Sequence, residues 1–288
     1  MKIALIGANG QLGTDLAEAI IEDKKFSLIA LTHKNIDIRN KQDMAKMLAV
    51  TDPDIVIDTA AYHKVDIVED NPEEAFLVNS VAVKNLAELC ASKDRTLVFI
   101  STDYVFGKDR CRRRPYTEAD IPAPVNVYGA SKVAGEHLAA MCPRHYIIRT
   151  SGLFGIAGSS GKGGNFVETM LRLAREKGEV RVVNDQVLSP TYTVDLARQI
   201  VYLLKVAPYG LYHAVSRNGC SWFDFAKRIF RATGMRVKCR PIPSCEFPTR
   251  AERPKYSVLK NARLEELKIS KMHSWQKSLK DYLAEKRI

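Results

Sequence analysis

The 288-residue sequence predicts an α/β protein built on a doubly wound parallel sheet. Three observations support this fold class. Short runs rich in Val and Ile alternate with longer amphipathic stretches, those runs are almost continuously apolar, and a glycine-rich turn follows the first of them. Strands that are apolar on both faces are typical of parallel sheets covered by helices. Right-handed crossovers between such strands place helices on both faces of the sheet.

The first apolar run leads into a turn with three glycines, Gly7-Ala8-Asn9-Gly10-Gln11-Leu12-Gly13. Glycine permits a tight turn and lets the backbone approach a pyrophosphate, whose oxygens then face the N–H groups of the following helix. Because the motif lies between an expected strand and an expected helix, it predicts a Rossmann-type dinucleotide site with Gly7, Gly10 and Gly13 at the cofactor.

The alternation of strands and helices continues through the first half of the chain. We expect strands over residues 2–6, 27–31, 54–58, 96–101 and 145–149. We expect helices over residues 12–22, 41–50, 72–92 and 130–141. The longest of these helices repeats apolar residues at helical spacing along one face, as a helix that packs on a sheet does.

The pattern changes after Arg149. Residues 156–165 are rich in Gly and Ser and predict a loop, and beyond Tyr209 the pattern is irregular and interrupted by prolines. Further elements are expected over residues 166–177 (helix), 180–183 (strand) and 194–206 (helix). We therefore expect a dinucleotide-binding domain over 1–151 with 166–206 packed onto it, and a smaller, partly discontinuous substrate-binding lobe from 152–165 and 207–288.

The end of the second strand should meet the adenosine ribose. An acidic residue there would bind the ribose 2′-hydroxyl of NAD, but the sequence has Thr32-His33-Lys34-Asn35. Lys34, with His33 as a second candidate, could bind the 2′-phosphate of NADP, so the sequence favours NADPH over NADH as the cofactor. A surface lysine without this role is the alternative. Asp37 and Ile38 follow and are expected beside the adenine.

The strongest chemical feature is Tyr128-Gly129-Ala130-Ser131-Lys132. Residues four apart on a helix share a face, so Tyr128 and Lys132 should act at one place. Reduction of a ketone needs a proton for the developing alkoxide, and a tyrosine can supply it. A neighbouring ammonium is expected to lower the pKa of that tyrosine, and the same lysine could bind the nicotinamide ribose. The pair Tyr-x-x-x-Lys is common by chance, but it is far more specific behind a dinucleotide motif.

The fourth expected strand ends at Ser101-Thr102-Asp103. The carboxyl ends of strands in such a sheet border the ligand crevice, so Thr102 is expected to donate a hydrogen bond to the reacting substrate oxygen. Asp103 could contact the sugar or support the site, and a turn or capping carboxylate is the alternative.

Composition excludes several other classes of protein. The formal net charge is +11, but the basic residues are dispersed. The densest run, residues 110–114, lacks interleaved aromatic residues, so a solvated loop or an aid to anion capture is expected rather than nucleic acid binding. The six cysteines form no C-x-x-C pair, so neither a metal site nor a disulfide framework is expected. Since no apolar run is long enough to span a membrane and no signal peptide is recognisable, we expect a cytoplasmic protein.

Taken together, the motifs resemble those of the dTDP-4-dehydrorhamnose reductase family, which belongs to the extended short-chain dehydrogenases/reductases. The resemblance extends over nearly the whole chain. Its motifs are residues 7–13, Asp58-Thr59-Ala60-Ala61-Tyr62, Val65-Asp66 with Glu69, residues 101–106, Pro115-Tyr116-Thr117-Glu118, Asn126-Val127-Tyr128-Gly129, Arg149-Thr150-Ser151, Asn165-Phe166-Val167, Asn184-Asp185-Gln186, Ser189-Pro190-Thr191 and Arg253-Pro254. The resemblance implies reduction of the C4 ketone of dTDP-4-dehydro-β-L-rhamnose to dTDP-L-rhamnose with NADPH or NADH.

The resemblance also implies roles for single residues. Tyr128 would be the proton donor, Lys132 its partner, and Thr102 the group that binds the reacting oxygen. The implied cofactor contacts are Gly10, Gln11 and Leu12 at the pyrophosphate, Asp37 and Ile38 at the adenosine, and Ala60, Ala61 and Tyr62 along the cofactor channel. The implied substrate contacts are Asn126, Asn165 and Arg253. A guanidinium can grip two oxygens of a diphosphate, although Arg253 could also be an ordinary surface arginine.

The sequence departs from the family pattern at three places. Gly152 stands where the family often has Trp, and Asp58 stands where it usually has Asn. Asp15 and Val194 stand at the positions of the glutamates on which some members build a magnesium-bridged dimer, so that arrangement is not expected here.

Two alternatives therefore stay open: another nucleotide-sugar epimerase, dehydratase or reductase, and a non-catalytic regulatory subunit like the one that partners methionine adenosyltransferase. Intact Thr102, Tyr128 and Lys132 favour an enzyme. We expect a nucleotide-sugar substrate and neither nucleic acid nor a membrane as partner, and leave a homodimer open.

Overall fold

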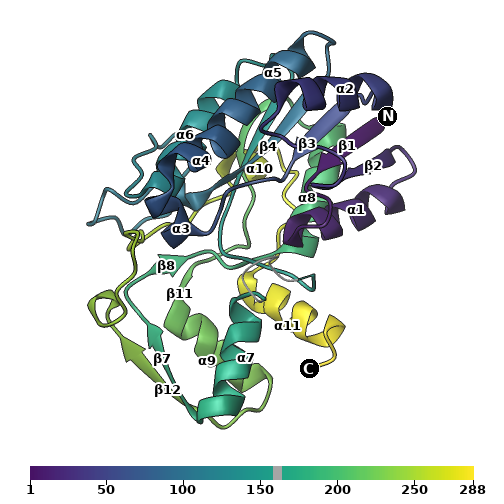
Figure 1. Cartoon of the computed structure of the whole chain (residues 1–288). Coiled ribbons are helices and arrows are strands. Elements are labelled where there is room, and N and C mark those ends of the chain that lie inside the picture. The colour runs from purple at the N-terminus through teal and green to yellow at the C-terminus, as the bar shows by residue number, and fades with distance from the viewer. Residues whose placement is uncertain (158–163) are drawn as a thin grey trace.

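A central six-stranded parallel sheet organises the computed structural model, which describes residues 1–157 and 164–288 (Figure 1). Its strand order is β10-β5-β4-β3-β1-β2, and every neighbouring pair is parallel. The strands are β1 (Lys2–Ile6), β2 (Ser27–Leu31), β3 (Ile55–Asp58), β4 (Thr96–Thr102), β5 (His145–Thr150) and β10 (Gly210–His213). The doubly wound sheet predicted from the sequence is confirmed.

Helices cover both faces of this sheet. On one face, Ile3 and Leu5 of β1 pack with α1 (Gln11–Glu22) and α8 (Thr193–Val206). On the other face, Ala4 and Ile6 of the same strand pack with α2 (Lys41–Thr51), α5 (Ala82–Ala91) and α6 (Val127–Ala139). Alternate residues of a strand point to opposite faces, so one apolar strand serves two cores.

The single helix predicted over 72–92 is wrong in detail. The chain forms α4 (Pro72–Phe76), a π-helical turn η1 (Leu77–Val81) and then α5, after a short α3 (Val65–Asp70). The π turn carries Asn79 and Ser80 inwards, where both bond to other elements. Apolar periodicity does not reveal such a local insertion, which often marks a functional site.

The smaller part of the molecule has its own apolar core (lower part of Figure 1). It contains α7 (Phe166–Lys177), β7 (Glu179–Val183), α9 (Trp222–Ala232), β12 (Lys238–Ile242) and α11 (Trp275–Glu285). Short strands link it to the sheet: β6 (Leu153–Phe154) pairs with β9 (Thr191–Tyr192), and β8 (Val187–Leu188) with β11 (Cys220–Ser221). The remaining short helices are η2 (Asp103–Val105), η3 (Ser244–Glu246) and α10 (Ala262–Glu266).

The packing differs from the expected domain assignment in two segments. The elements of residues 166–206 are shared between the two parts of the molecule. α8 packs on α1 as expected, whereas α7 and β7 belong to the core of the smaller part. Residues 207–288 also divide, since β10 is an edge strand of the main sheet. Both differences arise because packing partners far apart in sequence decide where a segment lies. The centre of the expected 156–165 loop, residues 158–163, lies outside the described residues.

Regular helices and strands occur after Tyr209, although the sequence pattern there is irregular. Pro241 lies within β12, which among the described residues pairs only with β7, and an edge strand tolerates the missing N–H of a proline. Among the described residues, no helix combines the length and apolarity needed to cross a bilayer.

Candidate active site

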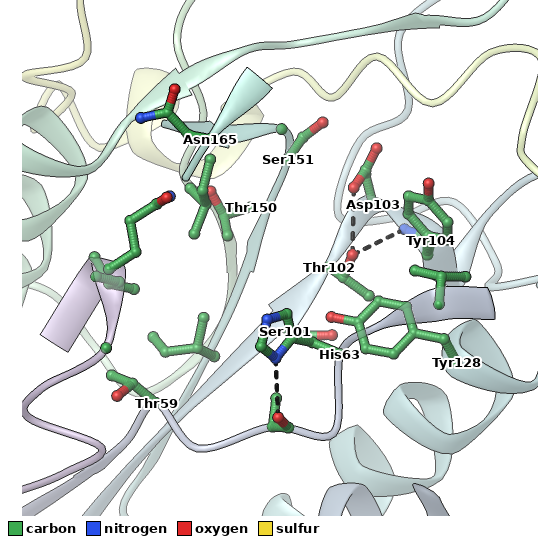
Figure 2. Close-up of a pocket in the computed structure, with 18 of the residues that line it drawn as sticks. Thr59, His63, Ser101, Thr102, Asp103, Tyr104, Tyr128, Thr150, Ser151 and Asn165 are labelled. Carbon is green, nitrogen blue, oxygen red and sulfur yellow. Dashed lines mark hydrogen bonds between the residues drawn. The ribbon is translucent and has the colours of Figure 1, made fainter. Parts of the chain in front are cut away.

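A cavity of about 590 Å³ opens at the carboxyl ends of β1, β3, β4 and β5, as expected for a doubly wound sheet. Both parts of the molecule line it (Figure 2). The predicted residues that line it are Gly7, Gly10, Gln11, Leu12, Gly13, Ala60, Ala61, Thr102, Asp103, Tyr128, Lys132 and Asn165. The structure therefore brings most of the predicted site together.

The glycine turn has no room for side chains. Gly7 has a φ of +78°, and a Cβ there would lie 2.6 Å from Thr59 Oγ1. A Cβ on Gly13 would lie 2.1 Å from the Gly7 carbonyl oxygen. Gly10 caps α1 without a side-chain hydrogen bond, and Gln11 Oε1 is buried with no partner among the described residues. These features fit a dinucleotide pyrophosphate at the N-terminus of α1.

At the adenosine end of the expected cofactor site, the predicted residues Lys34, Asp37 and Ile38 do not line the cavity. His33 lines the cavity, whereas Lys34 beside it is exposed and does not line the cavity. Asp37 pairs with Arg39 at 2.9 Å, and Ile38 is buried in the core below the second strand. The hydrogen bond and charge of Arg39 lower the pKa of Asp37. Arg39 is thus a cation near the expected adenosine site that the sequence analysis did not select.

Close packing of α6 on η2 brings Tyr128 beside Thr102. A Cβ on Gly129 would lie 2.1 Å from the Tyr104 carbonyl oxygen, so only glycine lets the two elements approach this closely. The rings of Tyr104 and Tyr128 meet edge to face, with centroids 5.7 Å apart. Asn126 caps the helix by accepting a hydrogen bond from the Gly129 N–H at 2.8 Å.

Asn126 has a structural role in the described chain. Besides capping α6, its Nδ2 donates to the Glu252 carbonyl oxygen at 2.7 Å, and the residue does not line the cavity. The cap also explains why α6 begins at Val127, three residues before the expected start. Tyr62 likewise does not line the cavity. Its backbone N–H donates to Asn79 Oδ1 at 2.9 Å, and its carbonyl accepts from Asn79 Nδ2 at 3.0 Å.

Thr102 and Asp103 end β4 at the cavity, with the Thr102 hydroxyl between Asp103 and Tyr104 (Figure 2). Its Oγ1 accepts from the Tyr104 N–H at 3.2 Å and lies 3.3 Å from Asp103 Oδ1. Asp103 Oδ2 accepts from the Ser257 hydroxyl at 2.5 Å. Burial raises the pKa of Asp103 to about 6, although these hydroxyl donors lower it.

The expected lowering of the Tyr128 pKa is wrong in this structure. Burial raises the pKa of Tyr128, the Thr102 side chain lowers it, and Asp103 raises it again. The ammonium of Lys132 lies over the Phe99 ring, 3.9 Å from the centroid. Burial also lowers the pKa of Lys132 to about 8. A tyrosine that keeps its proton is nevertheless suited to donate it.

Sequence reasoning missed two buried groups that support the site. Asn79 on the π turn joins the Tyr62 backbone to the Ser131 hydroxyl, 3.0 Å from Nδ2. Glu136 of α6 accepts two hydrogen bonds from Arg149, at 2.8 and 2.7 Å, and one from the Ser101 hydroxyl at 2.5 Å. Arg149 belonged to a motif noted in the sequence, but nothing there identified Glu136 as its partner.

The predicted substrate residues do not all reach the cavity. Asn165 does, while it caps α7 and donates to the Gly155 carbonyl oxygen at 2.9 Å. Arg253 does not line the cavity; its Nη2 donates to Asp66 Oδ2 at 2.7 Å, and its Nη1 is buried without a partner among the described residues. Leu188 and Trp222, which were not predicted, complete the wall from the smaller part.

Gly152 lines the cavity with a φ of +53°. A Cβ there would lie 2.7 Å from Leu188 Cδ1, so a larger residue at this position requires Leu188 to move. At this point the cavity is therefore lined by the backbone of Gly152 and by Leu188 rather than by an aromatic side chain of residue 152.

The fold and the arrangement of this site define a Rossmann-type protein of the extended short-chain dehydrogenase/reductase class. A family model described as RmlD substrate binding domain matches residues 1–288, and the chain belongs to this family. The family resemblance seen in the sequence is thereby confirmed.

Named relatives agree with this membership. Spore coat polysaccharide biosynthesis protein SpsK of Bacillus subtilis is 38% identical over 287 residues, covering 99% of this chain and 98% of that protein. The crystal structure of a dTDP-4-dehydrorhamnose reductase from Clostridium acetobutylicum is 39% identical, with a TM-score of 0.93 and 100% coverage of both chains. The dTDP-4-dehydrorhamnose reductase of Bacillus anthracis, solved in complex with NADP, is 38% identical, with a TM-score of 0.92 and 99% coverage of both chains.

Proposed function

We propose that this protein reduces the C4 ketone of dTDP-4-dehydro-β-L-rhamnose to a hydroxyl, giving dTDP-L-rhamnose at the expense of NADPH. One observation carries the proposal: Thr102 and Tyr128 lie side by side in the same cavity as the glycine turn. Relatives named as dTDP-4-dehydrorhamnose reductases, one of them in complex with NADP, support both the substrate and the cofactor.

The chain's own residues account for the proton transfer. NADPH, when bound along the glycine turn, supplies the hydride that is added to C4. The Thr102 hydroxyl donates a hydrogen bond to the C4 oxygen as negative charge develops there. The Tyr128 hydroxyl gives its proton to that oxygen. The ketone thereby becomes an alcohol, and Tyr128 becomes a tyrosinate. A charged Lys132, one helical turn away, stabilises the Tyr128 tyrosinate until the tyrosinate takes up a proton from solvent.

The far end of the cavity provides the contacts to the rest of the substrate. We assign the contact with the diphosphate to Asn165 at the N-terminus of α7, since helix N-termini bind anions, and the contact with the sugar to Asp103. Arg253 reaches the diphosphate only if it exchanges Asp66 for phosphate oxygens. The net charge of +11 favours capture of such an anionic substrate. We place this reaction in the cytoplasm and keep a homodimer as an assembly to be tested by sedimentation.

The test of the function is direct. The purified chain is mixed with NADPH and with dTDP-4-dehydrorhamnose made by the upstream enzymes, and NADPH oxidation is followed by absorbance while the product is identified by NMR. Stoichiometric formation of dTDP-L-rhamnose is expected. Absence of turnover together with tight binding to another protein would favour the regulatory-subunit alternative.

A second candidate substrate is another dTDP-linked 4-keto-6-deoxy sugar. The observation that favours it is Gly152, which has no side chain, so that Leu188 lines the cavity at this position. Comparing kcat/KM for the two ketosugars in the same assay decides between them.

A further inference from the structure

We propose that Asp58 is the counter-ion of Lys132: it holds the buried ammonium in position and keeps it charged, and so acts as a positioning residue for proton transfer at Tyr128. The inference rests on the proposed reduction, because it concerns the state of Lys132 that the reaction requires. Asp58 lies at the end of β3 and does not itself touch the reacting groups.

The sheet places the two charges on one face. In the parallel register of β3 and β4, Asp58 is the neighbour of Phe99, and neighbouring residues in register point to the same side of a sheet. The Lys132 ammonium lies over the Phe99 ring, 3.9 Å from its centroid. Asp58 and Lys132 therefore both lie next to Phe99, on the face of the sheet that α6 covers.

The carboxylate of Asp58 is incompletely satisfied. The residue is 1% exposed, and its Oδ1 accepts a hydrogen bond from the Ala60 N–H at 3.0 Å. Its Oδ2 is buried with no hydrogen-bond partner among the described residues. A buried carboxylate needs a compensating positive charge. Lys132 makes no direct ion pair with it, so the compensation is Coulombic and acts through the weakly screening interior.

No other group near Lys132 serves as well as a counter-ion. Glu136, one turn further along α6, also attracts the ammonium, but its two oxygens are engaged by Arg149. On α5, burial raises the pKa of the Cys90 thiol to about 12, and the charge of Asp58 adds to that rise. The thiol therefore stays neutral. Asp58 is thus the one nearby carboxylate in the described chain whose charge is not already balanced.

The pKa values of the two groups agree with this geometry. Burial lowers the pKa of Lys132 to about 8, and the Asp58 charge opposes that fall more than any other group. Burial raises the pKa of Asp58 to about 6, and the Lys132 charge opposes that rise. Each charge stabilises the other, so the two groups titrate as a pair. Without Asp58, burial would neutralise Lys132 closer to physiological pH.

The first test replaces Asp58 by Asn, which keeps the size of the side chain and the acceptor for Ala60. The basic limb of the kcat/KM profile should move about one pH unit lower, which is roughly a fivefold loss at pH 8, approaching about tenfold at pH 9, with little change at pH 6. The matched control is Asp54→Asn, just before the same strand, where the carboxylate accepts from the Lys2 N–H at 2.7 Å. A folded Asp58→Asn protein whose profile superimposes on that of the wild type overturns the proposal.

The second test needs no turnover and no Asp58 variant. The carboxyl carbon of Asp58 is titrated by ¹³C NMR in the wild type and in Lys132→Met. The pKa of Asp58 should rise when the ammonium is removed, and an unchanged pKa overturns the proposal. Failure of the proposed function gives a different result. The wild-type protein would then not turn over the ketosugar, while the pKa of Asp58 would still change in Lys132→Met.

Discussion

Arg149 on β5 grips the carboxylate of Glu136 on α6 with two hydrogen bonds, at 2.8 and 2.7 Å, and both side chains are more than nine-tenths buried. Glu136 lies one turn beyond Lys132, and it also accepts a hydrogen bond from Ser101 next to Thr102. This ion pair therefore joins the helix that carries Tyr128 to the two strands beside it.

Breaking this pair from one side should destabilise the fold strongly. Glu136→Gln leaves a buried guanidinium without its counter-charge, and such a change costs about 3–5 kcal/mol. Urea unfolding followed by circular dichroism measures the free energy of unfolding. The control is Glu176→Gln, which removes the exposed partner of Arg172 and should change stability by less than about 0.5 kcal/mol. Equal effects of the two variants would contradict the structural role of the buried pair.

Tyr128→Phe should abolish ketosugar reduction without loss of NADPH binding. Removing the hydroxyl removes the proton donor, which contributes about 10²- to 10⁴-fold to such a reaction, whereas the ring still fills its place against Tyr104. Turnover is measured by NADPH oxidation and binding by cofactor fluorescence. Tyr202→Phe, on α8 away from the cavity, is the control and should keep full activity. Full activity in Tyr128→Phe would exclude this proton donor.

Lys34→Ala should weaken binding of NADPH more than that of NADH. The side chain is exposed at the end of β2 next to His33, which lines the cavity, and a lysine there would interact only with the 2′-phosphate that NADPH carries. The ratio of the two dissociation constants is the quantity to measure. Lys24→Ala, before the same strand, should leave that ratio unchanged. If Lys34→Ala weakens both cofactors equally, Arg39 becomes the residue to test.

A larger residue at position 152 should destabilise the protein, and less so when Leu188 is replaced by a smaller residue. Gly152→Ala places a Cβ 2.7 Å from Leu188 Cδ1 and at a φ of +53°, so a loss of about 1–3 kcal/mol in stability is expected. The double variant with Leu188→Ala removes the contact but not the backbone strain, so it should recover part of the added cost. A double-mutant cycle measured by urea unfolding checks this, and strict additivity would show that the contact contributes nothing.

Stability should fall in mild acid because of His213. This histidine is buried, and burial together with the Arg149 charge lowers its pKa to about 3. The unfolded chain binds a proton near pH 6.5, whereas the folded chain does not until the pH is much lower. The resulting stability is present above pH 6.5 and is lost as the pH falls, by about 2 kcal/mol between pH 7 and pH 5.

The measurement for His213 compares two pH values and two proteins. In His213→Gln the contribution of this group is absent, so the difference in unfolding free energy between wild type and variant should shrink by about the same 2 kcal/mol on going from pH 7 to pH 5. A constant difference would mean that the histidine has the same pKa in the folded and the unfolded protein.

Much of the site could be predicted because its signals are local. The strand, glycine turn and helix around residues 2–22 follow one another in the sequence, and Tyr128 and Lys132 are joined by helical periodicity alone. Arg253 and Asn126 were less predictable. Their motifs were recognisable, but whether each side chain meets a ligand or a protein group depends on Asp66 and on the Glu252 carbonyl, which lie far away in the chain.

The sequence by itself determined the sheet, the cofactor turn and the pair of residues on α6, since all of these depend on the spacing of residues close together in the chain. Tertiary structure alone decided which charges are buried beside one another. The pKa of Tyr128 rises rather than falls because burial, together with the charge of Asp103, outweighs the hydrogen bond with Thr102. Electrostatic interactions depend on distance and burial in space, and no sequence pattern contains either quantity.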